Sequence, residues 1–422
     1  MPEATHIIEN ARQIIRFEKA DGKSNTVMGW IFRVLKDSAI AIQGNRIVAV
    51  GKQSDIHTQW FGSKTEIIDA SGMIVLPGFV DSHTHPVFMD TREREFEMRL
   101  SGKSYEEIVA AGGGIRSSIQ AVRKASKEEL LKKVLLRMDR FLELGTTTVE
   151  AKSGYGLSYE SELKSLEILK EAEQTHPITI VPTFLGAHEM PDEYRHNRED
   201  YIRLLTDVMI PRAAEEHLAK FCDVYCEQGV YSVAETLKIC VAAREAGLGL
   251  KIHADQFHAI GCAELAAEMG AVSVDHLEQV TPNGVETLRK FGSVATLLPG
   301  SVFFIGSNAY PPARQLIEAG VPVALATDFN PGSSMTQSMP LMATFAGIYM
   351  KMTPAEAIVA ATIHGAKALQ LENEIGNLAP GYRADIVLWD ADDYRMIPYY
   401  FGVNLVNTVI KNGTVLYSRS LN

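Results

Sequence analysis

The sequence lacks any long apolar run and any block of like charge. No stretch of about 18 consecutive apolar residues occurs along the chain, which excludes a transmembrane helix. The segment Met1 to Arg16 mixes acidic with apolar side chains and has no continuous apolar core, unlike a secretory signal. We therefore expect a cytoplasmic protein with no membrane partner.

Positive charge is also scarce. The 41 lysines and arginines are outnumbered by 52 aspartates and glutamates, and the formal net charge is -11. Because nucleic-acid phosphates attract basic surfaces, this balance argues against a nucleic-acid partner and favours a small-molecule substrate. The 46% of hydrophobic and 22% of charged residues are typical of a globular enzyme.

Cysteine is rare, with residues at Cys222, Cys226, Cys240 and Cys262. So few cysteines in a long chain do not make a disulfide framework, and there is no Cys-x-x-Cys pair. Cys222 and Cys226 could supply two metal thiolates, but no second pair of the zinc-finger type accompanies them. We predict that all of them are reduced residues of the core.

From Thr146 onward, a short β-branched strand, a polar turn and an amphipathic helix alternate, which indicates βα units. The segment 126–144 shows the helical pattern, because Ser126 and Glu129 form a capping box and Gly145 ends it. Strands are predicted at 73–80, 146–149, 178–185, 221–225, 248–252, 272–274, 294–298 and 321–327. Eight such units predict an α/β fold, a (β/α)8 TIM-like barrel with catalytic residues at the strand ends.

The two ends of the chain have a different pattern. Residues 39–42 and 47–50 flank a Gly44-Asn45 turn, and 408–417 contains Asn412-Gly413, so both segments are predicted hairpins. We expect one small β-sandwich domain built from residues 1–72 and 380–422. The barrel then spans 73–379, and its last helix is predicted at 353–369, with Thr353 as N-cap.

The segment Gly78 to His85 predicts a metal site. In an extended strand, residues i and i+2 point to the same side, so His83 and His85 can chelate one ion. His253 and Asp328 follow two later strands and complete a set of three imidazoles and one carboxylate, which suits Zn²⁺ or Fe²⁺. The alternatives are histidines with ordinary hydrogen bonds and an aspartate that caps a helix.

His276 ends another predicted strand. It could stabilise an oxyanion or contact a metal-bound water, and a structural role in which Asp275 holds it is the alternative. Asp328 could also accept a proton from that water.

His83, His85, His253, His276 and Asp328 together resemble the amidohydrolase superfamily, and the flanking segments resemble its imidazolonepropionase family over nearly the whole chain. The segments that resemble this family are LPGFVDSHTH (76–85), TREREFEMRL (91–100), AGGGI (111–115), EAKSGYGL (150–157), FLGAH (184–188), DHLE (275–278), ATDFNPG (326–332) and FGVN (401–404).

This resemblance implies hydrolysis of the ring of 4-imidazolone-5-propanoate to N-formimidoyl-L-glutamate, with one divalent metal ion, Zn²⁺ or Fe²⁺/Fe³⁺. It also implies a homodimer and a set of substrate-binding residues, namely Arg92, Tyr155, His188, Asn330 and Gly332. Without the resemblance, Arg92 would be assigned to a solvated charged segment and Tyr155 to a turn.

One position departs from the family pattern. Many members have a glutamate three residues after the ligand that corresponds to His253, whereas this chain has Gln256. An amide is not a base at neutral pH, so we assign proton transfer to Asp328 and His276 and give Gln256 an orienting role. The glycines at 112–114 predict a tight turn or lid over the barrel mouth, and no nucleotide is expected.

Two other functions fit the same pattern. A deaminase of this superfamily that acts on a nucleobase would use the same ion. A non-catalytic barrel that serves as a scaffold for protein assembly would be expected to lose metal ligands, and this chain keeps them.

Overall fold

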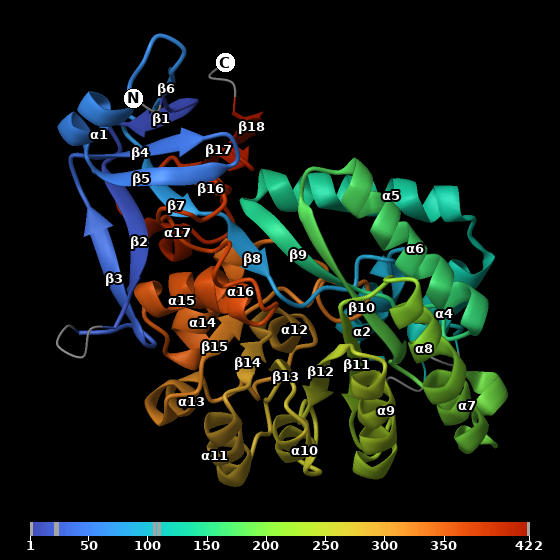
Figure 1. The fold of residues 1–422 in the computed structure, drawn as a ribbon. Coiled ribbons are helices and arrows are strands. Elements are labelled where there is room, and N and C mark those ends of the chain that lie inside the picture. Colours follow the sequence, from blue (N-terminus) through green and yellow to red (C-terminus); the bar gives the residue numbers. More distant parts are fainter. Residues whose placement is uncertain (1–2, 21–24, 104–106, 108–110, 420–422) are drawn as a thin grey trace.

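A computed structural model describes residues 3–20, 25–103, 107 and 111–419. Figure 1 shows a barrel of strands surrounded by helices, with the blue and red strands of the two chain ends assembled beside it. Both termini lie in this second region. None of the helices in the described ranges is long and apolar enough to cross a bilayer.

The barrel is a parallel eight-stranded sheet in which each strand pairs with its neighbours in sequence order. Its strands are β8 (Phe79–Asp81), β9 (Thr146–Lys152), β10 (Thr179–Ala187), β11 (Phe221–Cys226), β12 (Gly249–Ala254), β13 (Ser273–His276), β14 (Val294–Leu297) and β15 (Val323–Leu325). The prediction of a TIM-like barrel is confirmed.

The barrel closes just beyond the ends of β8 and β15. The backbone N–H of Asp328 donates to the carbonyl of His83 over 3.1 Å, and that of His85 donates to the carbonyl of Phe329 over 2.9 Å. Thr84 and Phe329 form the corresponding parallel bridge. The residues expected to bind a metal are therefore also the residues that join the first strand to the last.

Helices surround the barrel and border its mouth (Figure 1). They are α2 (Glu93–Leu100), α4 (Ile115–Lys124), α5 (Lys127–Glu143), α6 (Tyr159–Thr175), η1 (Asp192–Tyr194), α7 (Arg198–Leu204), η2 (Leu205–Met209), α8 (Ile210–Glu215), α9 (Val233–Glu245), α10 (Cys262–Glu268), α11 (Pro282–Phe291), α12 (Pro299–Phe304), α13 (Ala313–Ala319) and α14 (Met339–Met350). The predicted capping box of α5 is present, since Ser126 and Glu129 each accept the other's backbone N–H.

The prediction of a single helix at 353–369 is wrong. The chain forms α15 (Pro354–Ala361) and α16 (Ile363–Lys367), and Thr362 between them has φ -127° and ψ -93°. The break lets α16 lie against the barrel at Gly365, where a Cβ would overlap the carbonyl of Val80. The predicted cap is correct, because Thr353 and Glu356 form a capping box.

The chain ends form two sheets packed face to face. One has the order β5-β4-β1-β6 and the other β18-β17-β16-β7-β2-β3. The bounds are β1 (His6–Glu9), β2 (Gln13–Lys19), β3 (Trp30–Leu35), β4 (Ser38–Gln43), β5 (Arg46–Lys52), β6 (Glu66–Asp69), β7 (Ile74–Pro77), β16 (Ile386–Trp389), β17 (Val406–Lys411) and β18 (Thr414–Ser418), with helices α1 (Gln53–Trp60) and α17 (Met396–Tyr399). Ile8, Ile42 and Ile386 belong to the apolar cluster between the sheets, as in a β-sandwich.

The one strand predicted at 73–80 is in fact two strands in different sheets. β7 pairs with β2 and β16 in the terminal region, whereas β8 pairs with β9 in the barrel. The break is at Gly78, where a Cβ would overlap the side chain of Thr147. A continuous apolar run does not reveal that its two halves belong to different sheets.

The prediction of reduced cysteines is wrong for one pair. Cys226, at the end of β11, and Cys262, at the start of α10, form a disulfide with a Cα–Cα distance of 6.0 Å. Cys222 and Cys240 are buried free thiols. The pairing depends on the end of β11 lying against the start of α10, which the spacing of the cysteines does not encode.

The two predicted hairpin turns contact each other across the terminal region. Gly413 has a φ of 78°, and a Cβ at this position would overlap the carbonyl oxygen of Gly44 in the β4–β5 turn. Gly44 also has a positive φ, 59°, but a Cβ there would have no neighbouring atom within 4 Å. Both glycines therefore have a left-handed backbone, but only Gly413 lacks room for a Cβ atom.

We expect Gly413→Ala to lower the free energy of unfolding by about 2–3 kcal/mol, since it adds a backbone clash to the cost of a left-handed alanine. Gly44→Ala should cost only about 1 kcal/mol, because its backbone conformation alone is unfavourable for alanine. Urea unfolding of both variants checks this, and equal losses would contradict the proposed contact between the turns.

Candidate active site

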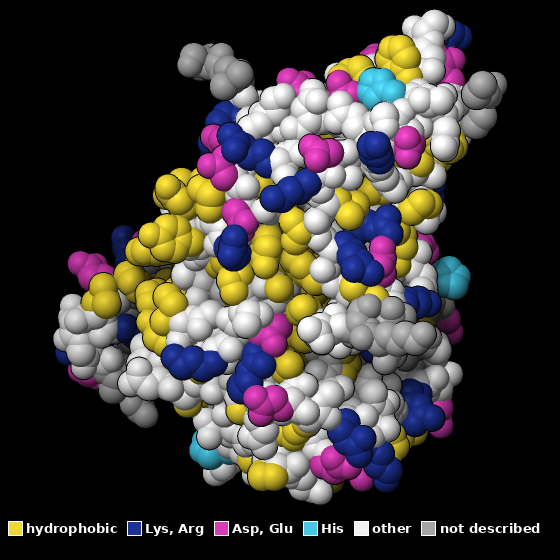
Figure 2. Space-filling model, turned by 90° about the vertical axis from the view of Figure 1, so that its left-hand side faces the viewer, with side chains coloured by type: hydrophobic (Ala, Val, Ile, Leu, Met, Phe, Trp, Pro, Cys, Tyr) yellow, Lys and Arg dark blue, Asp and Glu magenta, His cyan; other side chains and the backbone are white. Residues whose placement is uncertain are grey.

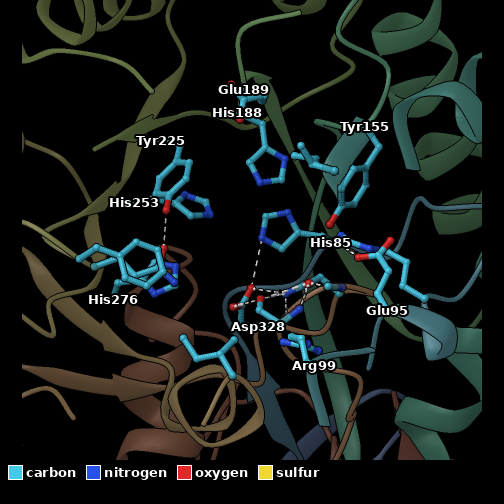
Figure 3. Close-up of a pocket in the computed structure, with 18 residues that line it drawn as sticks. His85, Glu95, Arg99, Tyr155, His188, Glu189, Tyr225, His253, His276 and Asp328 are labelled. Carbon is cyan, nitrogen blue, oxygen red and sulfur yellow. Dashed lines mark hydrogen bonds and ion pairs between the residues drawn. The ribbon is translucent and has the colours of Figure 1, made fainter. Parts of the chain in front are cut away.

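A cavity of about 410 Å³ opens at the carboxyl ends of the barrel strands. In Figure 3, Tyr225, His253 and His276 face His85, Tyr155 and His188 across this cavity, with Asp328 between the two groups. The predicted residues that line it are His85, Arg92, Tyr155, His188, His253, Gln256, His276, Asp328, Asn330 and Gly332. The structure thus brings together residues from the whole length of the barrel.

His83, His85 and His253 form a cluster whose ligand atoms all lie within 4.8 Å of one another. The Nε2 atoms of His83 and His85 are 3.2 Å apart. Ligand atoms about 2.0 Å from one tetrahedral cation lie roughly 3.3 Å apart, so this spacing fits a shared ion. The Nε2 atom of His253 is buried and has no hydrogen-bond partner among the described residues, as expected of a nitrogen reserved for a metal.

Two buried carboxylates orient these imidazoles. His83 Nδ1 donates to Asp275 over 2.6 Å, and His253 Nδ1 lies 3.1 Å from Asp223 Oδ1. Protonation at Nδ1 leaves the Nε2 lone pair of each ring available for a cation. Burial, followed by the charge of Lys152, holds the pKa of His83 well below its ordinary value, so this ring is neutral at pH 7.

His85 is oriented by packing. Its Nδ1 is buried without a hydrogen-bond partner in the described part of the chain, and its ring stacks on that of His188, with centroids 5.1 Å apart and an interplanar angle of 17°. Burial lowers the pKa of His85 to about 4, so this ring is also neutral at pH 7.

A lysine beneath the cluster neutralises the carboxylates. The Nζ of Lys152 lies 2.6 Å from Glu150 and 2.7 Å from Asp223, and all these side chains are fully buried. Asp275 is 3.9 Å from the same nitrogen. Burial alone would lower the pKa of Lys152, but the charges of Asp223, Glu150 and Asp275 raise it above its ordinary value.

Asp328 lies against the histidine cluster, with Oδ1 3.4 Å from His85 Nε2 and 3.6 Å from His83 Nε2. Burial opposes its ionisation, but the hydrogen bond with His85, followed by the interaction with His276, lowers its pKa below the ordinary value. Asn330 donates to Asp328 Oδ1 over 3.1 Å. The carboxylate is therefore ionised at neutral pH and held in a fixed direction.

His276 ends β13 with a left-handed backbone, φ 82°. Its nearest carboxylate is that of Glu278, 3.4 Å from Nδ1. The alternative in which Asp275 holds His276 is therefore wrong, because Asp275 hydrogen bonds to His83. Burial would lower the pKa of His276, but the charge of Glu278 raises it above its ordinary value.

The remaining predicted residues form one wall and the mouth of the cavity. Arg92 pairs with Glu95 over 2.6 Å, and its guanidinium lies directly against Gly332, where a Cβ would overlap it. Tyr155 is buried. His188 Nδ1 donates to the carbonyl of Gly154 over 2.9 Å, which fixes its ring beside His85.

Gln256 is fixed by an unpredicted neighbour. The Tyr225 hydroxyl donates to its Oε1 over 2.7 Å, which leaves the amide N–H₂ as a donor toward the cavity. The glycine-rich turn contains no free anion cradle at Gly114, because the backbone N–H of Gly114 donates to Glu95.

Sequence reasoning missed Lys152, Asp223, Glu278, Tyr225 and Arg99. A usable signal existed for Glu150 and Lys152, which alternate with apolar residues in a buried strand and have the same i, i+2 spacing as His83 and His85. Asp223 and Tyr225 alternate in the same way in β11. Charged residues at inward positions of barrel strands indicate support for a site.

Comparison with known proteins identifies the relatives of this chain. A sequence model of the Amidohydrolase family matches residues 98–417. The chain is 44% identical over 420 residues to the imidazolonepropionase of Clostridium tetani, covering 100% of both chains. It is 47% identical over 385 residues to that of Geobacillus kaustophilus, covering 91% of both.

Solved structures support the same fold at low sequence identity. An adenosine deaminase from Xanthomonas campestris with bound zinc has a TM-score of 0.73 at 19% identity, covering 100% of this chain and 95% of that one. Guanine deaminase from E. coli has a TM-score of 0.74 at 15% identity, covering 98% and 100%. These two similarities concern the fold alone.

We expect Lys152→Met to lower the free energy of unfolding by about 3–5 kcal/mol, because it leaves Glu150 and Asp223 buried without their cation. Lys132→Met, at an exposed position of α5, is the matched control and should change stability by less than about 0.5 kcal/mol. Urea unfolding measures both. Similar small effects of the two substitutions would show that Lys152 does not compensate the buried carboxylates.

Proposed function

The chain belongs to the Amidohydrolase family and, within it, to the imidazolonepropionases, and from that membership we propose hydrolysis of the cyclic amide bond of 4-imidazolone-5-propanoate. The product is N-formimidoyl-L-glutamate, and the reaction is the third step of L-histidine degradation. The main observation in its favour is the convergence of three buried imidazoles and an ionised aspartate at a cavity that also contains an arginine.

We assign one divalent cation to His83, His85, His253 and Asp328. The two Nδ1 bonds to Asp275 and Asp223, together with the unpartnered Nε2 of His253, support this ligand set. Three imidazoles and one carboxylate suit Zn²⁺ or iron, and the Xanthomonas campestris relative in fold has bound zinc. When bound, such a cation polarises a carbonyl oxygen and lowers the pKa of a coordinated water to about 7.

Asp328 transfers the proton, and His276 stabilises the negative charge that develops on the carbonyl oxygen. Asp328 accepts a proton from the attacking water, whose oxygen bonds to the ring carbonyl carbon. His276 donates a hydrogen bond to the carbonyl oxygen as negative charge develops there. The C–N bond then breaks, the electron pair goes to the ring nitrogen, and the proton on Asp328 is transferred to that nitrogen.

The other cavity residues bind the substrate. The guanidinium of Arg92 is suited to the carboxylate tail, because it can make paired hydrogen bonds. Tyr155, His188, Asn330 and the backbone at Gly332 line the space between Arg92 and the histidine cluster, where the ring would lie. The amide of Gln256 orients the ring by hydrogen bonding.

The alternative of a nucleobase deaminase rests on the shared fold. The deaminases similar in structure are 19% or less identical to this chain, whereas the imidazolonepropionases are 44% and 47% identical over nearly all of it. A cavity arginine also matches a substrate with a carboxylate tail. We therefore rank the ring-opening hydrolysis first.

The test offers freshly prepared imidazolone propionate to the purified protein and follows the loss of its ultraviolet absorbance. Guanine, cytosine and adenine are then tested for ammonia release. Ring opening without ammonia release supports the proposal, and the reverse result would establish the deaminase instead.

His83→Ala should remove the bound metal and reduce kcat/KM by more than about a thousandfold, because it deletes a ligand and the orienting contact of Asp275. His196→Ala, at an exposed position, is the control and should leave both unchanged. Elemental analysis after dialysis measures the metal independently of turnover. Full metal content and activity in His83→Ala would refute the ligand assignment.

The exposed apolar surface supports the prediction of a homodimer. Figure 2 shows hydrophobic side chains gathered on one flank of the molecule. A hydrophobic groove is lined by Ile348, Tyr399 and Phe401, and the last two are 78% and 71% exposed. Exposed patches of this kind commonly bind a second protein surface, and we propose a second copy of this chain.

Sedimentation velocity should therefore give twice the mass of one chain. Tyr399→Asp should shift the protein to monomers at micromolar concentration, because it places a charge in the apolar contact. Leu237→Asp, at an exposed apolar position on α9, is the control and should stay dimeric. Dimers of Tyr399→Asp would exclude this groove from the interface.

We propose the cytoplasm as the compartment, in keeping with a catabolic enzyme for a small amino-acid derivative. The disulfide is compatible with a reducing compartment because Cys226 and Cys262 are fully buried, which limits attack by cellular thiols.

A further inference from the structure

Two arginines of the same helix line the active-site cavity. Arg92 precedes α2 and Arg99 is in its last turn, so two helical turns place both on one face, with Glu95 between them. Figure 3 shows Glu95 and Arg99 among the residues that line the cavity. Arg99 lies outside the set of residues assigned to the substrate above.

The two guanidinium groups differ in their partners. Arg92 is paired with Glu95, whose other carboxylate oxygen accepts the backbone N–H of Gly114. The guanidinium of Arg99 has no hydrogen bond or ion pair with any residue of the described ranges. Its guanidinium carbon lies instead 5.1 Å from the ring centroid of Phe304 and 5.8 Å from that of Phe96.

The aromatic rings hold Arg99 without satisfying its charge. Phe96 and Phe304 stack on each other with centroids 5.0 Å apart, which gives the guanidinium a rigid apolar support. Its N–H donors remain available for a ligand. Burial, and then the nearby charge of Arg92, lowers the pKa of Arg99, which nevertheless stays charged at neutral pH as guanidinium groups do.

The acidic residues around the cavity make the charge of the Arg99 guanidinium important for binding an anion. The chain has a net charge of -11, and Glu95, Glu189 and Asp328 also line the cavity. The proposed divalent cation offsets this field at the histidine cluster, and a guanidinium group would offset it for the anionic tail of a substrate. Arg92 shares its charge with Glu95, so Arg99 is the lining guanidinium without a carboxylate partner among the described residues.

We propose that Arg99 is a second carboxylate-binding residue of the active site, which binds the tail carboxylate of the substrate together with Arg92 and selects for substrates with an anionic chain. This inference rests on the proposed function. It adds to that function a residue, Arg99, that selects for the substrate tail and takes no part in opening the ring.

The experiment compares Arg99→Gln with Arg94→Gln, which removes the same charge from the same helix at an exposed position outside this cavity. Each variant and the wild type are assayed with imidazolone propionate and with its neutral propanamide analogue. Arg99→Gln should raise KM for the carboxylate about tenfold with kcat within about twofold, because tail binding is equal in the ground and transition states. KM for the amide should not change, and Arg94→Gln should behave as wild type.

Arg99→Lys provides a second variant, which keeps the charge but loses the paired donors. Its KM for the carboxylate should rise about threefold. Equal increases in KM for the carboxylate and the amide after Arg99→Gln would assign Arg99 to packing against Phe304 and overturn the inference. Unchanged KM values in an active Arg99→Gln enzyme would also overturn it, while leaving the proposed function intact.

Failure of the proposed function gives a different result. The wild-type protein would then leave imidazolone propionate unchanged. That result would also exclude a role of Arg99 in binding the tail of this substrate. Circular dichroism of each variant confirms that the fold is retained, so that a KM change reports on the cavity.

Discussion

Two buried hydrogen bonds from histidine to aspartate, His83 to Asp275 and His253 to Asp223, are the interactions on which the site depends. They fix which nitrogen of each ring carries the proton and so leave the other nitrogen facing the cavity. Buried carboxylates are costly unless a cation and hydrogen bonds compensate them. Lys152 supplies that charge from β9, with its Nζ bonded to Asp223 of β11 and to Glu150 of its own strand.

The barrel makes this arrangement possible. Side chains that alternate along β9 and β11 point inward at the same level, so a lysine from one strand meets an aspartate from another beneath the histidines. Apolar residues on the outer sides of the strands pack against the helices and belong to one continuous core. The interior therefore holds a polar layer directly under the cavity, while the hydrophobic burial that stabilises the fold lies around it.

Much of the fold and part of the site could be predicted from the sequence, because the spacing of apolar and polar residues follows the secondary structure. Seven of the eight barrel strands and the capping boxes at Ser126 and Thr353 follow from local patterns, and the predicted barrel brings the strand ends that carry His83, His85 and His253 together. Local patterns do not encode which segments meet. The division of 73–80 at Gly78, the Cys226–Cys262 bond and the support of His83 by Asp275 each depend on contacts between residues far apart in the chain. Arg99 was missed because an arginine on a charged helix looks like a solvent-exposed residue in sequence.

The closure of the barrel at the site itself has a consequence for biosynthesis. Asp328 is positioned by a backbone hydrogen bond to His83, and His85 by one to Phe329, so the ligand cluster is complete only when the first and last barrel strands have met. Chain growth on the ribosome is vectorial, and contacts between such distant segments form late. A nascent chain that has not yet emerged beyond β15 therefore has its histidines but lacks Asp328, so this end of the cavity can be assembled only after the last barrel strand has been made.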